Sequence, residues 1–247
     1  MRSIVGDVEL TEEQAQAANS GLKALMPLIG AKTMLDFIVE NVTAAGFSNI
    51  CLVIGPEHGA IRDFCASRKL PVVFAEQPEA KGTADAVLAS KEFVGAENFL
   101  VINSDNLYPV DGLRRLRAAN RPVLLAFDRA NLIEQSNISA DRVASFATVE
   151  IDAAGNLTSI VEKPETVEAD SLVSMNAWLF SPEIFRACSA IGPSAERGEY
   201  ELTAAVQFAI DDLGVKFSAI TTGEGVLDLS NRGDIDTASA FLAGRNQ

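Results

Sequence analysis

The chain has few cysteines and a single histidine, and this limits the sites that it can build. Its 247 residues include three cysteines, Cys51, Cys65 and Cys188, which are scattered and form no C-x-x-C pair. Scattered cysteines without metal-ligand spacing favour a reducing compartment, so we expect a cytoplasmic protein. His58 lies in a Pro-Glu-His-Gly turn, so no histidine-based metal site or catalytic triad can be assembled.

Basic residues and long apolar runs are also scarce. The chain has 20 Lys and Arg against 34 Asp and Glu, which gives a formal net charge of −14. Such a charge repels nucleic-acid backbones and anionic membrane surfaces, so we expect neither as a partner. We find no apolar run of bilayer length and no export signal. An anionic small substrate would need local cations or a metal to offset the negative field.

What is present is a regular alternation of strands and helices in the first half. With 48% hydrophobic residues the chain can fill a proper core. The pattern predicts strands at 50–54, 71–75, 99–102 and 123–127, and helices at 33–45, 60–68, 82–91 and 113–119. This order predicts an α/β fold, a three-layer α/β/α sandwich with a mainly parallel, Rossmann-like sheet.

The second half changes character. Two apolar segments, 146–151 and 157–161, flank the turn sequence Asp152-Ala-Ala-Gly-Asn156 and predict a hairpin. Further strands are predicted at 173–180, 215–221 and 225–229, with helices at 182–190, 201–213 and 234–242. Near the start, Thr11-Glu-Glu-Gln14 has the form of a capping box. Because no linker or repeat interrupts this order, we expect residues 1–247 to form a single domain.

The stretch from Phe99 to Tyr108 is the strongest functional signal. Four apolar residues, Phe99 to Ile102, are followed at once by Asn103, Ser104, Asp105 and Asn106. Ligands of open α/β sheets bind beyond the carboxyl ends of such strands. Asp105 lies at that point and has two plausible roles, which are to bind a divalent metal or to cap the next turn.

Two further motifs follow predicted strands. In Gln77-Pro-Glu-Ala-Lys-Gly82-Thr83, a loop leads to a helix start, where free backbone N–H groups suit an anion and an amide side chain suits a base edge. The alternative is an ordinary helix start capped by Thr83. Glu162-Lys163-Pro164 ends a strand, and a turn at Pro164 would let both charged side chains reach one pocket. The alternative is a solvated charged pair.

Two polar residues interrupt apolar strands. Asn176 lies in Met175-Asn-Ala-Trp178, where burial is expected, so it needs a protein or ligand partner. Asp228 lies in Val226-Leu-Asp-Leu229, and a buried carboxylate without a partner is very costly. Asp105 and Asp228 would balance each other's cost by sharing a cation.

In this order the motifs resemble those of the sugar-1-phosphate nucleotidyltransferases, also called nucleotide-sugar pyrophosphorylases. The resemblance extends from Gly21 to about Leu242. The segments that carry it are Lys23-Ala-Leu-Met-Pro27, Gln77, Gly82-Thr83-Ala84, Asp105, Glu162-Lys163-Pro164, Asn176, Arg197 to Thr203, and Asp228. Each motif is weak alone, and together in order they are fairly specific.

The resemblance implies an enzyme with two substrates, a nucleoside triphosphate and a sugar-1-phosphate. The products would be a nucleotide-sugar and pyrophosphate. It implies Mg²⁺ as cofactor, held by Asp105 and Asp228, with Lys23 neutralising triphosphate charge. Three residues would hold the sugar-phosphate, with Lys163 at the phosphate and Glu162 and Asn176 at the sugar. Gln77 and Gly82 would bind the base, and Thr83 belongs to the same substrate-binding motif.

The sequence departs from that family at its start. Members begin with a strand that runs into a G-x-G-x-R loop, whose backbone N–H groups bind phosphates. Nothing here matches, so we expect the first strand and phosphate loop to be missing before residue 1. The alternative function is therefore a catalytically inactive nucleotide-sugar-binding or regulatory homologue. A missing strand would expose its neighbour, which makes a homo-oligomer possible. Trp178, where the family usually has a small residue, would narrow the sugar pocket or fill core.

Overall fold

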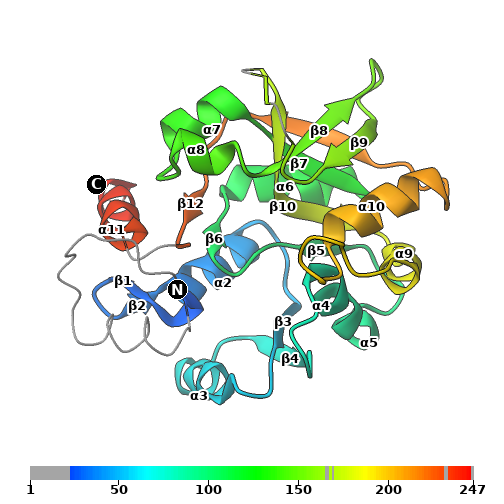
Figure 1. Cartoon of the computed structure of the whole chain (residues 1–247). Helices are drawn as coiled ribbons and strands as arrows, with labels where there is room; N and C mark the ends of the chain where they lie inside the picture. Colours follow the sequence, from blue (N-terminus) through cyan, green and yellow to red (C-terminus); the bar gives the residue numbers. More distant parts are fainter. Residues whose placement is uncertain (1–22, 165–166, 169, 231–232, 246–247) are drawn as a thin grey trace.

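The computed structural model describes residues 23–164, 167–168, 170–230 and 233–245, and a six-stranded sheet is its centre (Figure 1). Strands β11, β7, β10, β8 and β9 follow one another across this sheet, and β5 pairs with a separate part of β10. The bounds are Phe99–Val101 for β5, Val123–Asp128 for β7, Ala147–Ile151 for β8, Leu157–Val161 for β9, Leu172–Phe180 for β10 and Ser218–Thr222 for β11.

The α/β class is confirmed, but the sheet is mixed rather than mainly parallel. Within this sheet β11 pairs with β7 in parallel, whereas β10 runs antiparallel to β5, β7 and β8. The hairpin of β8 and β9 adds a further antiparallel pair. The alternation in the first half suggested parallel strands, but β10 enters from the second half in the opposite direction and joins both halves.

Helices cover the sheet on both faces. Their bounds are Lys23–Leu25 for the 3₁₀-helix η1, Met34–Ala44 for α2, Gly59–Arg68 for α3, Thr83–Ala89 for α4, Lys91–Val94 for α5, Val110–Ala119 for α6, Arg129–Gln135 for α7, Ala140–Val143 for α8, Ile184–Ala190 for α9, Leu202–Asp211 for α10 and Asp234–Arg245 for α11. The helix expected at 82–91 is thus divided into α4 and α5. The expected helix start at Thr11 lies outside the described residues.

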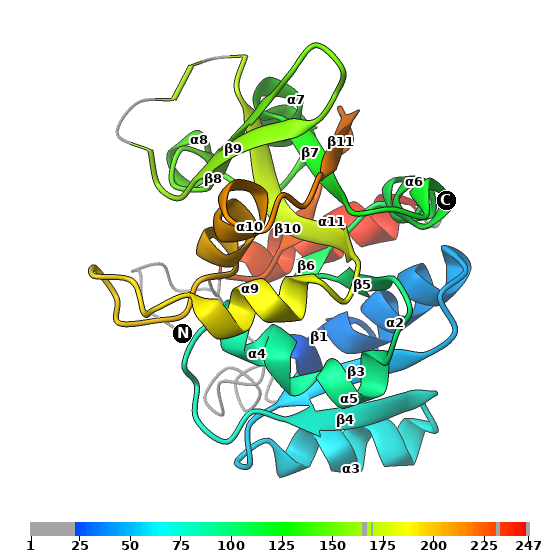
Figure 2. The ribbon, with the colours of Figure 1, turned by 90° about the vertical axis from the view of Figure 1, so that its right-hand side faces the viewer.

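Strand β7 separates two hydrophobic cores. Val123, Leu125 and Phe127 belong to the first core, which also contains residues of α2, α6 and α11. Leu124 and Ala126 point to the opposite face and belong to the second core, with residues of α4, α9 and α10. In Figure 2, α9 and α10 lie in front of the strands. A sheet with a helical layer on each face is the predicted three-layer arrangement.

Three two-stranded ribbons complete the described part of the chain. Strands β1 (Pro27–Ile29) and β2 (Lys32–Thr33) lead into α2, where Thr33 and Asp36 form a capping box. Strands β3 (Ile50–Ile54) and β4 (Val72–Glu76) pair in parallel. Strands β6 (Asn106–Leu107) and β12 (Leu227–Asp228) pair antiparallel. The last ribbon joins two acidic segments that are far apart in the sequence. No helix among the described residues is long and apolar enough to cross a bilayer.

Trp178 fills the second core, which settles one of the two interpretations left open by the sequence. Its side chain has no exposed area and stacks on Phe180 at a ring-centroid distance of 5.2 Å. The ring of Phe217 meets it edge-on at 5.9 Å. These contacts make Trp178 a packing residue of the sheet.

Replacing Trp178 therefore tests the packing of the second core. Trp178→Ala should lower the free energy of unfolding by about 3–5 kcal/mol, because it leaves a cavity among aromatic rings. Urea denaturation followed by circular dichroism measures this loss. The matched control is Phe93→Ala on α5, where the side chain is 40% exposed and the change should stay within about 0.5 kcal/mol. Equal losses in the two variants would contradict the packing described here.

Candidate active site

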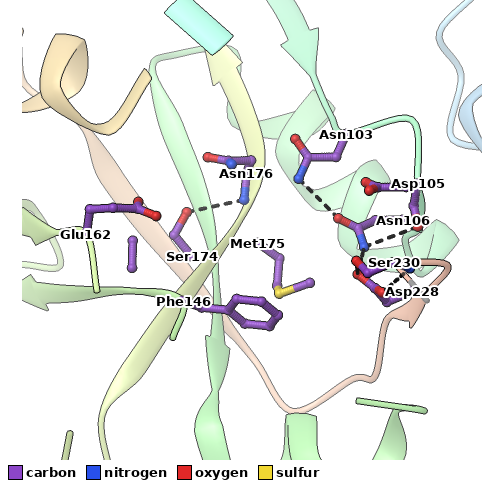
Figure 3. A pocket seen from close by; sticks show the side chains of 11 residues that line it. Asn103, Asp105, Asn106, Phe146, Glu162, Ser174, Met175, Asn176, Asp228 and Ser230 are labelled. Carbon is purple, nitrogen blue, oxygen red and sulfur yellow. Dashed lines mark hydrogen bonds between the residues drawn. The ribbon is translucent and has the colours of Figure 1, made fainter. Parts of the chain in front are cut away.

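A polar cavity of about 150 Å³ lies where the β6–β12 ribbon meets the main sheet. Figure 3 shows its side chains, which come from the segment between β5 and β6, from the start of β8, from the end of β9, from β10 and from β12 with the turn after it. The lining residues are Asn103, Asp105, Asn106, Phe146, Ala147, Glu162, Ser174, Met175, Asn176, Asp228 and Ser230. Four of the site residues predicted from the sequence are therefore brought together: Asp105, Glu162, Asn176 and Asp228.

The β6–β12 ribbon brings the two predicted metal ligands to one cavity. Asp228 of β12 lies opposite Asn106 of β6, and the backbone N–H of Leu229 donates to the carbonyl of Asp105 over 2.9 Å. Asn106 also connects the two segments through its side chain, which donates to Asp228 Oδ2 over 2.8 Å (Figure 3). Backbone pairing of two short strands thus fixes the relative position of both acidic residues.

Asp105 has a cationic partner, but its pKa is still raised above the usual value. Its Oδ2 lies 3.6 Å from Lys23 Nζ, which comes from η1. Burial raises the pKa of Asp105, and the negative charge of Asp228 raises it further, whereas Lys23 acts in the opposite direction. Asp105 lies in the turn before β6, and it does not cap the following helix, α6, whose N-cap is Pro109.

Asp228 is buried, and both of its carboxylate oxygens already accept hydrogen bonds. Oδ1 accepts from Arg142 Nη2 and from the backbone N–H of Ser230 at 2.6 Å. Oδ2 accepts from Asn106 Nδ2 at 2.8 Å and from Ser230 Oγ at 3.0 Å. A carboxylate offers about four lone-pair sites, so these donors use its full capacity.

The backbone of Asp228 is clamped by the segment between α7 and α8. Asn137 Oδ1 accepts from the Asp228 N–H and Asn137 Nδ2 donates to the Asp228 carbonyl, both at 2.8 Å. Ser136 Oγ accepts from the backbone N–H of Val226 over 2.9 Å. This close approach requires glycine at 225, where a Cβ would lie 2.0 Å from the carbonyl oxygen of Gln135.

Glu162 and Lys163 point to different surroundings. Glu162 lines the cavity, and its pKa is raised first by burial and then by the charge of Glu201, which outweigh Arg197. Lys163 has a left-handed backbone conformation with φ +44°, and its Nζ lies 3.3 Å from Glu196. The sequence suggested that both side chains would reach one pocket, but the left-handed turn directs the exposed lysine to Glu196 instead.

Asn176 stands at an irregularity of β10. The register between β10 and β7 shifts between Ser174 and Trp178, and Asn176 has φ +57°. It is half-buried rather than enclosed, and its Oδ1 accepts from Trp178 Nε1 over 3.4 Å. A left-handed asparagine inside a strand is strained, and such strain is concentrated at functional sites. The irregularity directs the amide to the cavity (Figure 3).

The predicted base-binding residues form a separate group at the start of α4. Gln77 Nε2 donates to the carbonyl of Gly82 at 3.1 Å and to Asp85 at 2.8 Å. Gly82 is the N-cap of α4 with φ +119°, and a Cβ there would lie 2.6 Å from the carbonyl of Tyr200. Thr83 does not cap α4, as the alternative had it, because its Oγ1 accepts from the N–H of Leu202 instead.

Sequence reasoning missed several residues that shape the cavity. Asn103 and Asn106 stood in the polar stretch around Asp105, but no feature distinguished them from turn residues. Asn103 Nδ2 donates to Asn106 Oδ1 over 3.1 Å, which fixes the amide that holds Asp228. Ser230 follows Asp228 closely and was a detectable candidate. Arg142 gave no signal, because it becomes a neighbour of Asp228 only through the fold.

The donor set agrees with a hard divalent cation shared with a ligand. Among the described residues, no group of three or more His, Cys, Asp or Glu side chains is arranged to hold a metal. Mg²⁺ needs only one or two protein carboxylates when water and substrate phosphates complete its shell. Asp105 and Asp228 supply two carboxylates to one cavity. Asp228 would have to exchange one of its present donors.

Comparisons with known proteins agree with this architecture. The crystal structure of a UDP-glucose pyrophosphorylase complexed with UDP-glucose superimposes with a TM-score of 0.73 at 17% sequence identity and covers 90% of each chain. At this identity the likeness concerns the fold alone.

Sequence relatives point in the same direction. A glucose-1-phosphate thymidylyltransferase of Streptomyces griseus is 31% identical over 78% of this chain, which spans 52% of that relative. The UTP–glucose-1-phosphate uridylyltransferase AglF of Haloferax volcanii is 27% identical, with 87% of this chain and 85% of the relative covered. The family model described as nucleotidyl transferase matches residues 18–244. Since that match includes nearly every residue, the chain belongs to the nucleotidyl transferase family.

Proposed function

We propose that this protein transfers a nucleotidyl group from a nucleoside triphosphate to a sugar-1-phosphate. A phosphate oxygen of the sugar-1-phosphate forms a bond to the α-phosphorus, the bond from that phosphorus to the β-phosphate oxygen breaks, and pyrophosphate leaves. The product is a nucleotide-sugar. The family membership and the activities for which the two relatives are named support this reaction.

The observation that carries the proposal is one cavity with two chemically different ends. Figure 3 shows Glu162 and Asn176 toward one end, and Asp105 and Asp228 toward the other. Carboxylate and amide groups suit sugar hydroxyls, since they accept and donate hydrogen bonds. A pair of carboxylates suits a cation that carries phosphates. A sugar-1-phosphate lying along the cavity would satisfy both ends.

The metal end would neutralise charge. Lys23 would contact the triphosphate, since its ammonium already faces Asp105 at 3.6 Å. Asp105 and Asp228 would hold Mg²⁺, and a bound Mg²⁺ offsets negative charge on phosphate oxygens during in-line displacement. Alignment and charge neutralisation are the main contributions of a protein to such a transfer. A chain with a net charge of −14 needs these local cations to receive anionic substrates.

The other roles are assigned by the same logic. Glu162 and Asn176 would bind the sugar, and Lys163 would exchange Glu196 for the sugar phosphate, since its long stem leaves the ammonium free to move. Gln77 would form hydrogen bonds to the edge of the base, and Gly82 and Thr83 would contact the substrate next to it. The cytoplasmic location and the formation of a homo-oligomer stay predictions of the sequence.

Pyrophosphate release tests the reaction. We expect release with glucose-1-phosphate, Mg²⁺ and at least one nucleoside triphosphate, with UTP and dTTP tried first because of the relatives' activities. The measurement is a coupled phosphate assay, with calorimetric titration of UDP-glucose and dTDP-glucose alongside. Tight binding of a nucleotide-sugar without release from any pair would favour the inactive binding or regulatory homologue instead.

Removing one carboxylate tests the metal end. Asp105→Asn should reduce turnover at least ~100-fold and abolish the Mg²⁺ dependence of nucleotide binding, because an amide is a weak ligand for a hard cation. The melting temperature should stay close to that of the wild type. Asp111→Asn on α6 is the control, since its side chain is 75% exposed and pairs with Arg114. If Asp105→Asn unfolds, and nucleotide binding by the wild type does not depend on Mg²⁺, the role of Asp105 is structural only.

Glu162 allows a test that separates stability from binding. Because the pKa of Glu162 is raised in the folded protein, the charged form of this side chain lowers the free energy of unfolding. This loss of stability is absent below the ordinary pKa of a glutamate. It grows as the pH rises through the raised pKa of Glu162. Glu162→Gln should therefore raise the melting temperature at neutral pH but not at about pH 4, and should weaken sugar-phosphate binding. The exposed Glu150 provides the control Glu150→Gln, for which both quantities should stay unchanged. A lower melting temperature at neutral pH would contradict the assignment.

A further inference from the structure

Arg142 on α8 connects two buried carboxylates. Its Nη2 donates to Asp228 Oδ1, and its Nη1 donates to both oxygens of Asp234 at 2.9 and 3.0 Å. The side chains of Asp228 and Asp234 are 5% and 11% exposed. Two carboxylates buried at one cation would repel each other strongly without it. Arg142 therefore acts as their counter-ion in protein that holds no divalent cation.

The hydrogen bonds of Asp228 leave no free position for a further ligand. Arg142 supplies one of the four donors, Ser230 supplies two and Asn106 supplies one. A divalent cation can therefore reach Asp228 only when one of these donors leaves.

Of these donors, Arg142 is the one that a cation would displace. Ser230 and Asn106 are neutral and belong to the same ribbon and turn as Asp228, so they move with it. Arg142 comes from a different element and carries a positive charge, which repels a second cation at the same carboxylate. It also keeps its two hydrogen bonds to Asp234 after leaving Asp228, so its own charge stays paired.

We propose that Arg142 is a positioning residue that competes with the divalent cation for Asp228. This inference rests on the proposed function, since it takes Asp105 and Asp228 as the ligands of the cation. Without the cation, Arg142 neutralises Asp228 and Asp234 together. With the cation, Arg142 releases Asp228 Oδ1 and retains Asp234. The free protein consequently binds the cation weakly, and a triphosphate, which brings its own oxygen ligands, makes the exchange favourable.

Binding of Mn²⁺ without nucleotide, followed by electron paramagnetic resonance of the free ion, tests this competition. Arg142→Met should bind Mn²⁺ at least ~10-fold more tightly than the wild type, because the competing charge is gone. Arg142→Lys should fall between them, since an ammonium cannot hold two carboxylates as a guanidinium fork does. Asp234→Asn should bind Mn²⁺ ~3-fold more weakly. In this variant Arg142 has lost the charged partner that it would keep after leaving Asp228, so it leaves Asp228 less readily. Arg62→Met, which breaks the exposed pair with Glu76, is the control and should leave the affinity unchanged.

A second measurement separates this role from simple structural support. In chelator the melting temperature of Arg142→Met should fall, and saturating Mn²⁺ should raise it by more degrees than it raises that of the wild type. Equal Mn²⁺ affinity in wild type and Arg142→Met, or weaker affinity in the variant, would overturn the competition while the proposed function stands. Absence of Mn²⁺ binding that depends on Asp105 in every variant would overturn both.

Discussion

The carboxylates of half-buried Asp105 and buried Asp228 face one cavity, and the backbone pairing of β6 with β12 keeps them there. Their mutual repulsion has to be balanced, since the charge of Asp228 raises the pKa of Asp105. Lys23 pairs with Asp105 and Arg142 pairs with Asp228, and each cation comes from a different element. The clamp at Asn137 and the close approach at Gly225 fix β12 to the segment between α7 and α8.

Local sequence patterns were sufficient for most of the fold. The helix that begins after Thr33, the hairpin around Asp152 and the strand before Asp105 are each determined by residues close in the chain, and each was predicted. The capping box at Thr33 was not predicted, and the strand before Asp105 is half-buried rather than buried. Strand direction was predicted less well, because β10 runs against its neighbours for reasons that lie in long-range topology. The bounds of the last helices and strands shifted by a few residues, as end effects commonly do.

For the site, the residue types were predictable and their directions were not. Polar residues inside apolar segments, such as Asn176 and Asp228, indicate a site because an apolar strand does not need them. Periodicity suggests which face they occupy, but the positive φ values at Asn176 and Lys163 depart from strand geometry and redirect both side chains. Arg142 and Asn137 had no sequence signature at all. They matter only because α7 and α8 pack against β12, and no short pattern encodes that contact.

Strand β10 has a mechanical consequence for the cavity. It is nine residues long, and it is hydrogen-bonded to β7 along one edge and to both β5 and β8 along the other. Sliding β10 against the strands beside it would break several main-chain hydrogen bonds at once. The cavity wall formed by Ser174, Met175 and Asn176 is therefore held by its neighbours on both edges. The cations Lys23 and Arg142 contact the lining carboxylates Asp105 and Asp228 from other elements, so the charge of the cavity can change through side-chain torsions while this strand stays in place.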